Sequence, residues 1–302
     1  MALTIEHVIR LVAGQTGLRP VAPPLHGACW LDDGERRIHV AAGTHWLQLA
    51  RRPGGPALDH HGMAIESLRM HMAKFALDGA GRALLRVEVP QVSLDGEYLL
   101  RALAALSRDD GAPPRSGALS SEPPRLGHEM ILPDELMVYV RTLAHEGWIV
   151  KEHVGENHWR LTHFAADRIF RVDLGFNRSW ACFQLALRPA ETAISELSRR
   201  HLAAYLLRHN DVSYWAKLGL GGTDQVVLTL DVPIEQFDLE RMRLAARTLA
   251  RYAVATSTEV QVLSRLDAEP NLRRLLEARR ASQTPADPSL RDPAPGLVMV
   301  AN

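Results

Sequence analysis

The stretch AKFALDGAGRALLRVEVPQVSLDGEYLLRALAALSR, residues 73–108, aligns without a gap with AKLGLGGTDQVVLTLDVPIEQFDLERMRLAARTLAR, residues 216–251. The two segments share 12 identities in 36 positions, and each matched residue recurs 143 positions further along the chain. The identities include Lys74/Lys217 and Pro90/Pro233. A match of this length at one constant offset predicts that the chain contains the same structural unit twice.

Each copy of this segment predicts two strands joined by a turn and followed by a capped helix. A proline ends the second strand, because proline cannot donate to a strand ladder, and an aspartate five residues later is placed to cap the helix. Apolar residues flank each cap at the spacing of a hydrophobic staple. The caps and staples are formed by Leu94, Asp95 and Leu99 in the first copy and by Phe237, Asp238 and Met242 in the second.

The residues around the repeat extend each unit to helix, three strands, helix, two strands and helix. Residues 3–14 favour a helix that Thr4 caps and Gly17 ends, and residues 28–51 favour three short strands. Gln184-Leu185-Ala186 repeats Gln48-Leu49-Ala50 at an offset of 136, so seven extra residues are expected within 191–209 of the second copy. The predicted fold class is α+β, with two tandem α-β-β-β-α-β-β-α units, each an antiparallel sheet packed with helices.

Composition divides the chain into four parts. Residues 1–108 are predicted to form the first unit and residues 131–266 the second, and the Pro- and Gly-rich residues 109–130 form the linker. Residues 267–302 are predicted to form a helical and then Pro-rich tail. The apolar residues 297–301 near its end are expected either to be disordered or to add as a strand to an exposed sheet edge.

The charge distribution argues against a nucleic-acid-binding surface. The chain has 35 basic and 35 acidic residues and no basic stripe, whereas nucleic-acid binding needs a concentrated basic face that neutralises phosphates. Direct binding is therefore not favoured. Glu6 and His7 interrupt the apolar pattern at the N-terminus, so neither a signal peptide nor a membrane span is expected and a cytoplasmic location follows.

The residues that invite a metal hypothesis do not have the spacing of a metal site. An H-E-x-x-H helix is absent from the sequence, and residues 158 and 163 are an odd number apart, so they point to opposite faces of a strand. We interpret these histidines as ordinary surface or partly buried residues. The histidines concerned are His145, His153, His158 and His163.

No pattern of a catalytic or cofactor-binding site is found either. Gly219 and Gly221 lead into a strand rather than into a helix, so they predict a hairpin turn and not a phosphate-binding loop. Cys29 and Cys182 are expected to be buried free thiols. The chain is therefore expected to have no catalytic, cofactor-binding or metal-binding residues and not to be an enzyme.

The repeated lysines and the aromatic residues are the candidates for a binding surface. Two of the three lysines in the chain open equivalent strands, and we interpret them as solvated edge residues that discourage aggregation, with a paired binding contact as the alternative. An exposed subset of the aromatic residues would form a protein-binding surface, since Trp and Tyr dominate such contacts. The candidate protein-binding residues are Trp215, Tyr214, Trp180, Lys217 and Lys74.

In the second copy Ala216-Lys217-Leu218 lies in the short strand, Leu230-Asp231-Val232-Pro233 ends the next one, and Asp238-Leu239-Glu240 opens the capped helix. These motifs and the predicted order of elements resemble the YbjN family and, through it, the type III secretion chaperone-like fold. The resemblance covers residues 133–263 well and 3–108 less well. It implies a bacterial, non-enzymatic protein that holds or escorts protein clients, often as a dimer, and it provides no catalytic residue.

The expected function is that of a chaperone-like or adaptor protein that binds protein clients through exposed apolar surface and sheet edges. A DNA-maintenance protein is one candidate client. The two units are expected either to pair with each other as an internal pseudo-dimer or to pair across the chains of a homodimer. Two alternatives are a small-molecule sensor with a pocket between the units and a direct nucleic-acid-binding or DNA-maintenance accessory protein. The latter would use Arg273, Arg274, Arg279 and Arg280.

Overall fold

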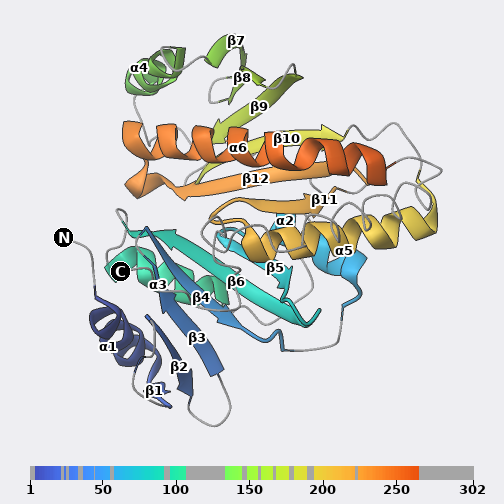
Figure 1. Ribbon diagram of the computed structural model, residues 1–302. Coiled ribbons are helices and arrows are strands. Elements are labelled where there is room, and N and C mark those ends of the chain that lie inside the picture. The colour runs from blue at the N-terminus through green and yellow to red at the C-terminus, as the bar shows by residue number, and fades with distance from the viewer. Residues whose placement is uncertain are drawn as a thin grey trace, which may run out of the picture.

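The computed structural model describes residues 4–21, 24, 27–32, 37–43, 45–54, 58–91, 96–106, 133–144, 148–155, 158–165, 168–176, 180–188, 194–221 and 224–264. These residues form a mixed α+β fold that contains two six-stranded antiparallel sheets (Figure 1). The predicted linker 109–130, the tail 267–302 and the predicted cap Asp95 lie outside the described residues.

Each half of the chain provides one of the two sheets. The first half comprises α1 (Ile5–Thr16), β1 (Arg19–Pro20), β2 (Ala28–Asp32), β3 (Arg37–Ala42), β4 (Trp46–Arg51), α2 (His60–Arg69), β5 (Ala73–Leu77), β6 (Ala83–Pro90) and α3 (Gly96–Leu106). The second half comprises α4 (Pro133–Ala144), β7 (Trp148–Gly155), β8 (His158–Ala165), β9 (Arg168–Phe176), β10 (Trp180–Arg188), α5 (Glu196–Val212), β11 (Lys217–Leu220), β12 (Val226–Pro233), the 3-10 turn η2 (Ile234–Gln236) and α6 (Leu239–Leu263).

The strand order is the same in both sheets, β1-β2-β3-β4-β6-β5 in the first and β7-β8-β9-β10-β12-β11 in the second. Four strands precede the middle helix of each half, so the prediction of three is wrong. In the first half the additional strand is β1, which lies at the start of the proline-rich segment 18–27. Proline is tolerated there because β1 is an edge strand and pairs on one side with β2.

Local capping devices begin α1 and α6, and end α1, as the sequence predicts. The Thr4 side chain accepts a hydrogen bond from the backbone N–H three residues on, and Gly17 ends α1 in the left-handed conformation at φ 74°. Asp238 caps α6 in the same way as Thr4 caps α1. Phe237 and Met242, the predicted staple, are both buried.

Strand register corrects the predicted alignment of the residues that precede the repeat. Gln48 on β4 lies opposite Glu88 on β6, and Cys182 on β10 lies opposite Asp231 on β12. Because Glu88 and Asp231 are equivalent in the repeat, Cys182 is equivalent to Gln48 at an offset of 134, and the predicted match at 136 is wrong. Nine residues rather than seven are therefore inserted. Side chains on a strand alternate with a period of two, so the sequence pattern looks the same at either offset.

The apolar face of each sheet packs against helices from its own half. In the first half α1 and α3 contact each other and the sheet, and in the second half α4 and α6 do so. Among the described residues, no helix combines the length and the apolar character needed to cross a bilayer.

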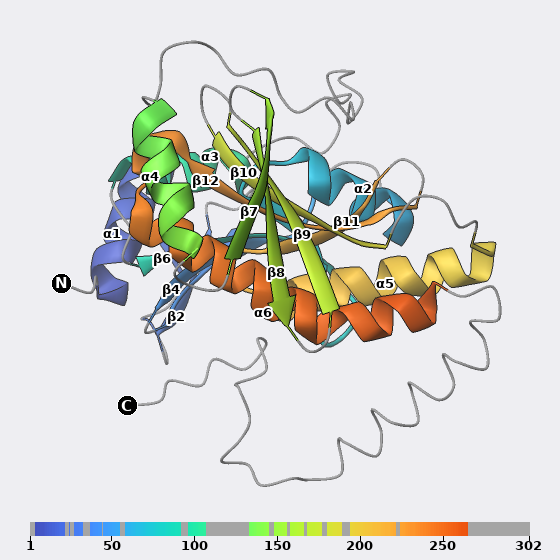
Figure 2. The ribbon, with the colours of Figure 1, turned by 90° about the horizontal axis from the view of Figure 1, so that it is seen from above.

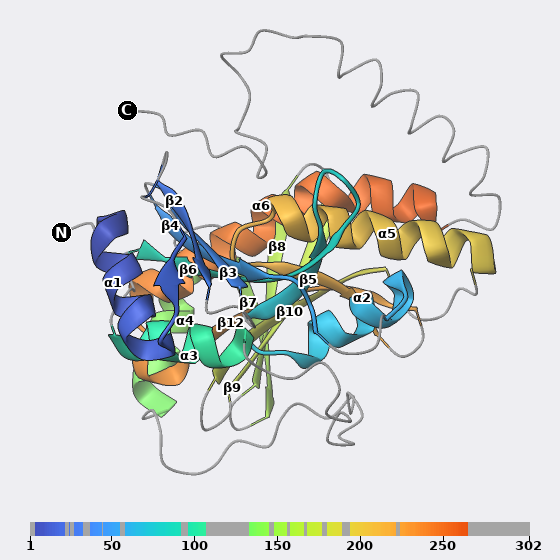
Figure 3. The ribbon, with the colours of Figure 1, turned by 90° about the horizontal axis from the view of Figure 1, so that it is seen from below.

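The opposite face of each sheet is partly covered by a helix from the other half. Helix α2 packs on β11, helix α5 packs on β5, and the two helices also contact each other. Figures 2 and 3 show α5 and α6 side by side, and Figure 2 shows α2 beside β11. Each half therefore contributes a helix that packs on the edge strand of the other half, α2 on β11 and α5 on β5.

The close approach of α2 to β11 is made possible by a glycine. A Cβ atom on Gly219 of β11 would lie 2.5 Å from the backbone oxygen of Ala64 and 2.5 Å from the Cγ of Leu68, both on α2. Distances this short are not tolerated, so α2 can pack on β11 only because position 219 has no side chain. The equivalent residue in the first half is Ala76.

Replacing this glycine tests the packing of α2 on β11. We expect Gly219→Ala to lower the free energy of unfolding by about 2–3 kcal/mol, because the methyl group forces two backbones apart. Gly79→Ala is the matched control, since nothing lies within 4 Å of its Cβ position, and it should change stability by less than about 0.5 kcal/mol. Urea denaturation measures both values, and equal effects of the two substitutions would contradict the packing described here.

Candidate functional site at the junction of the two halves

The two repeated lysines are buried where the halves meet. Lys74 is 1% exposed and Lys217 is 3% exposed, so the interpretation of both as solvated edge residues is wrong. They do lie on the edge strands β5 and β11, but helices of the opposite half cover those strands. Burial of a lysine requires a counter-ion and hydrogen-bond acceptors, and these come from both halves.

Each lysine pairs with a carboxylate of its own half and crosses the junction to a backbone carbonyl of the other. Lys74 Nζ lies 3.0 Å from Glu88 Oε2 and donates to the carbonyl oxygen of Ser213. Lys217 Nζ lies 2.5 Å from Asp231 Oδ2 and donates to the carbonyl oxygen of Met70. Met70 and Ser213 are 143 residues apart, as the two lysines are. The two halves therefore make the same contact to each other in both directions.

A further buried ion pair, between Arg86 of the first half and Asp211 of the second, crosses the junction. Arg86 Nη1 donates to both the carboxylate and the backbone oxygen of Asp211 on α5. Arg86 Nε also lies 3.3 Å from Glu88 Oε1. With Lys74 this makes a cluster of two cations and two anions that is nearly free of solvent. Its formal charges cancel, which is the condition under which buried charges are tolerated.

Burial perturbs the acid–base behaviour of this cluster. Burial lowers the pKa of Lys74 to about 8, although the neighbouring Glu88 carboxylate opposes this effect. Burial likewise raises the pKa of Asp211, and Arg86 opposes it. Burial alone would also raise the pKa of Asp231, but the Lys217 ammonium prevails and lowers it.

The backbone and a polar side chain reinforce the same junction. Met72 and Trp215, which are 143 residues apart, both adopt the left-handed conformation, at φ 63° and 64°. This conformation is uncommon for bulky residues and persists only where the surroundings enforce it. Asn210 on α5 donates to the carbonyl oxygens of both Phe75 and Leu218, each at 2.9 Å, so it joins β5 to β11.

Aromatic stacking follows the same reciprocal pattern. Trp46 of the first half stacks on Tyr214 of the second, with ring centroids 5.8 Å apart. Trp180 of the second half stacks on His71 of the first, with centroids 4.7 Å apart and rings inclined by 9°. Tyr214 and His71 are equivalent residues of the repeat. Each tryptophan therefore contacts the same position of the opposite half.

The five candidate protein-binding residues, Trp215, Tyr214, Trp180, Lys217 and Lys74, all lie at this junction. Trp215 is buried beside Trp46, and the other four make the contacts just described. In this structure their partners belong to the opposite half of the same chain. Their predicted role in binding a separate protein stays a prediction.

The junction also contains a cluster that the motif search missed. Nitrogen, sulfur and oxygen donor atoms of His71, Cys182 and Asp231 all lie within 4.8 Å of one another. Local spacing cannot reveal this cluster, because the three residues come from the segment after α2, from β10 and from β12. The signal available in the sequence was the repeat itself, since Asp231 is matched to Glu88.

The histidines that first suggested a metal site do not form this cluster. His158 Nε2 lies 3.5 Å from Asp173 Oδ1, and the ring of His163 stacks on Trp148. His145 and the side chain of His153 lie outside the described residues.

The two cysteines are both free thiols, as predicted, but they differ in exposure. Cys29 is buried and Cys182 is half-buried. Burial and the nearby Asp231 carboxylate raise the pKa of the Cys182 thiol. The predicted glycine hairpin is confirmed, because β11 leads directly into the antiparallel partner β12.

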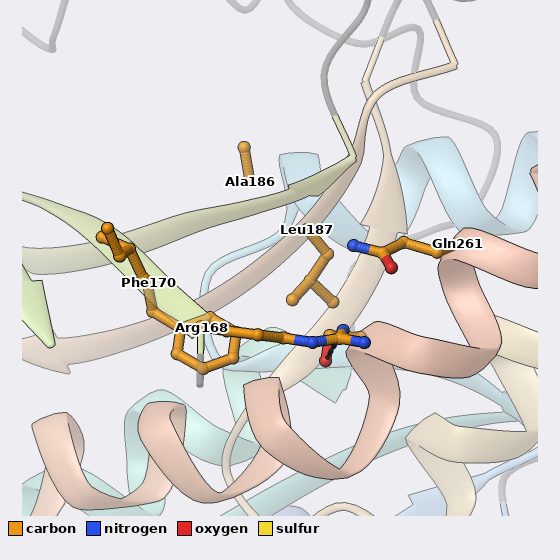
Figure 4. Close-up of a pocket in the computed structure, with 7 residues that line it drawn as sticks. Arg168, Phe170, Ala186, Leu187 and Gln261 are labelled. Carbon is orange, nitrogen blue, oxygen red and sulfur yellow. Dashed lines mark hydrogen bonds between the residues drawn. The ribbon is translucent and has the colours of Figure 1, made fainter. Parts of the chain in front are cut away.

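A surface pocket of about 270 Å³ lies away from the junction, between β9, β10 and α6 (Figure 4). Figure 4 shows Arg168 extending from the sheet towards α6, beside Leu187 and Gln261. Arg168 Nη1 donates to Ser257 Oγ at 2.7 Å, so its charge is engaged within the protein. This pocket lies within the second half, whereas the sensor alternative requires a pocket between the units.

Neither a family model nor a curated protein matches the chain.

Removing one buried lysine tests the charge cluster. We expect Lys74→Met to lower the free energy of unfolding by about 1–3 kcal/mol, because the buried carbonyl oxygens of Ser213 and Ala216 and the Glu88 carboxylate lose their hydrogen-bond donor. Adding Glu88→Gln should recover part of this loss. The control is Arg101→Met, which breaks an exposed pair with Glu97 and should cost less than about 0.5 kcal/mol. Urea denaturation is the measurement, and a loss for Lys74→Met as small as that of the control would refute the proposed dependence on this cluster.

The lowered pKa of Lys74 predicts a pH dependence of stability. The folded protein releases the Lys74 proton near pH 8, and the unfolded chain releases it near the ordinary value of 10.5. Between these values Lys74 binds more protons in the unfolded chain, so its contribution to the free energy of unfolding of the wild type should rise with pH. The Lys74→Met/Glu88→Gln double variant lacks this rise. The free energy of unfolding of the wild type minus that of the double variant, measured by urea denaturation, should therefore increase between pH 8 and pH 10.5. A constant difference would show that the pKa of Lys74 is not lowered.

Proposed function

We propose that this chain is a non-enzymatic, chaperone-like or adaptor protein built from two copies of one YbjN-like unit. The identical strand orders of the two sheets support the duplication, as do contacts that recur at positions 143 residues apart. Repeated left-handed residues before β5 and β11 add to this support, because chance does not place them at the same offset.

We infer further that the two copies pair with each other inside one chain as an internal pseudo-dimer. Helices α2 and α5 each pack on an edge strand of the opposite half. Lys74 and Lys217 each use a carbonyl of the opposite half as an acceptor. A copy on its own would expose these helix faces and leave its buried charges without part of their partners.

The observation that carries the proposed binding function is an apolar strand patch on the second sheet, formed by Ile149, Phe164 and Ile169. These side chains are 43%, 53% and 57% exposed, which is high for large apolar residues. Phe164 lies directly opposite Ile169 in the β8–β9 register, and Ile149 lies opposite Thr162, two residues from Phe164. Alternation along a strand therefore places all three on one face. Contiguous exposed apolar residues of this kind are typical of protein-binding surfaces.

Polar residues adjoin the patch on the same face. Arg160 Nε lies 2.9 Å from Asp173 Oδ1, and residue 160 alternates with 162 and 164 along β8. An apolar centre with a polar, solvent-accessible rim is the usual composition of a protein–protein interface. This arrangement favours a client that presents an apolar segment with charged residues at its margin.

The apolar face supports client binding better than the sheet edges do. The outer edge strand of the first sheet, β1, is two residues long. The outer edge strand of the second sheet, β7, has two register irregularities. Short or bulged edge strands resist pairing with another strand. We therefore place the client on the face of β7, β8 and β9.

No described residue adds support to the alternatives. Arg273, Arg274, Arg279 and Arg280, which would carry direct nucleic-acid binding, lie outside the described residues. A DNA-maintenance protein stays one candidate client, and the strand patch does not distinguish it from others.

Affinity purification tests the proposed function. We expect the wild type to recover a stoichiometric protein partner from native lysate, identified by mass spectrometry. Phe164→Ser/Ile169→Ser should reduce recovery at least about tenfold, because these side chains would form the apolar centre of the interface.

The matched control is Leu100→Ser, which removes an exposed apolar side chain on α3 of the first half. It should leave recovery unchanged. Circular dichroism of each variant shows whether the fold is retained. Absence of a stoichiometric partner, or equal recovery with the patch variant, would rule the proposal out.

A further inference from the structure

Three side chains with metal-binding donor atoms meet at the junction of the two halves. Cys182 and Asp231 lie directly opposite each other on β10 and β12, and therefore on the same face of the second sheet. His71 reaches them from the segment that follows α2. The donor atoms lie within 4.8 Å of one another, and His71 Nδ1 is 3.5 Å from Asp231 Oδ2.

The imidazole is held in place, but its Nδ1 atom is not used in a good hydrogen bond. His71 Nδ1 is shielded from solvent, and its nearest acceptor is Asp231 Oδ2. Its 3.5 Å distance to Asp231 exceeds that of an ordinary N–H···O hydrogen bond. The stacked Trp180 ring holds the imidazole plane. A buried nitrogen without such a partner is uncommon and calls for an explanation.

The first half contains a natural comparison for this site. Lys74 and Glu88 correspond to Lys217 and Asp231, so the buried ion pair is present in both halves. Beside the Lys74–Glu88 pair, Gln48 takes the place that Cys182 has beside Lys217 and Asp231. Tyr214 of the second half takes the place of His71 there. The junction is therefore built in one place without a thiol or an imidazole. The pairing of the halves does not explain why Cys182 and His71 are present in the other.

The donor set selects the class of metal. Imidazole, thiolate and carboxylate are the three ligand types of Zn²⁺ in proteins, whereas Mg²⁺ and Ca²⁺ take oxygen ligands. Tetrahedral Zn²⁺ with bonds of about 2.0–2.3 Å separates its ligand atoms by about 3.3–3.8 Å. The His71–Asp231 distance already lies in this range, and small side-chain rotations would bring the remaining donor atoms into it.

We propose that His71, Cys182 and Asp231 form a binding site for a thiophilic divalent cation of the Zn²⁺ type, with the fourth position open to a further ligand. His71 belongs to the first half and the other two ligands to the second, so the bound ion links the halves. The hydrogen bond to the carbonyl oxygen of Met70 keeps the Lys217 ammonium near the site. Its positive charge repels the bound cation and so lowers the affinity of the site for the metal. The half-exposed His71 and Cys182 leave a route for the ion to enter.

Cobalt substitution of the full chain tests this site directly. Co²⁺ takes the place of Zn²⁺ and gives a thiolate-to-cobalt charge-transfer band in the near ultraviolet only when a cysteine is bound. We expect this band at one equivalent of Co²⁺, its loss when Zn²⁺ is added, and no effect of Mg²⁺. The apparent melting temperature should rise with Zn²⁺, because a ligand that binds only the folded state stabilises it.

The first half supplies the substitutions for this test. His71→Tyr and Cys182→Gln introduce the residues found at the equivalent positions, so both variants should fold. Each should weaken Zn²⁺ binding, measured by calorimetry, at least about 100-fold. Removing a residue that only hydrogen-bonds to a metal ligand costs about 10–100-fold in affinity, and removing the ligand itself should cost more. Cys29→Ala removes the other thiol and should retain the band. Absence of the band in the wild type, or Zn²⁺ affinity unchanged in Cys182→Gln, would overturn the proposal.

Discussion

The buried lysines at the junction are the constraint on which the arrangement of the two halves depends. An ammonium group removed from water is tolerated only when a carboxylate and backbone acceptors surround it. Lys74 finds its carboxylate in its own half, at Glu88, but takes carbonyl acceptors from Ser213 and Ala216 of the other half. Separating the halves would leave this charge under-satisfied. The same geometry around Lys217 makes the dependence mutual.

The differences between the halves are as informative as their shared contacts. Helix α2 spans 10 residues and α5 spans 17, and Gly219 stands where the first half has Ala76. Ser67 Oγ accepts a hydrogen bond from the N–H of Phe75, whereas the equivalent Asn210 bridges two strands. Because both halves belong to one chain, matched positions of the junction can carry different residues. This freedom allows the His71–Cys182–Asp231 cluster to exist on one side only.

The proposed binding surfaces use the same face of the second sheet at two separate places. Its β11–β12 edge is covered by α2 and holds the proposed metal site. The apolar strand patch lies on β7, β8 and β9, at the other end of the strand order. A client on the patch would therefore leave the junction intact. An ion at the junction would act on the client only through the relative placement of the halves.

The sequence by itself determined the features that depend on residues close together in the chain. Thr4 and Asp238 cap their helices and Gly17 ends one, because a cap needs only the backbone of the next turn. The α+β class followed from apolar periodicity, and the 143-residue offset located equivalent strands. Tertiary structure decided the burial of Lys74 and Lys217, the register that aligns Gln48 with Cys182, and the meeting of His71 with Asp231. Each of these is set by packing between segments far apart in sequence, and a side chain's own neighbours do not reveal which distant segment will cover it.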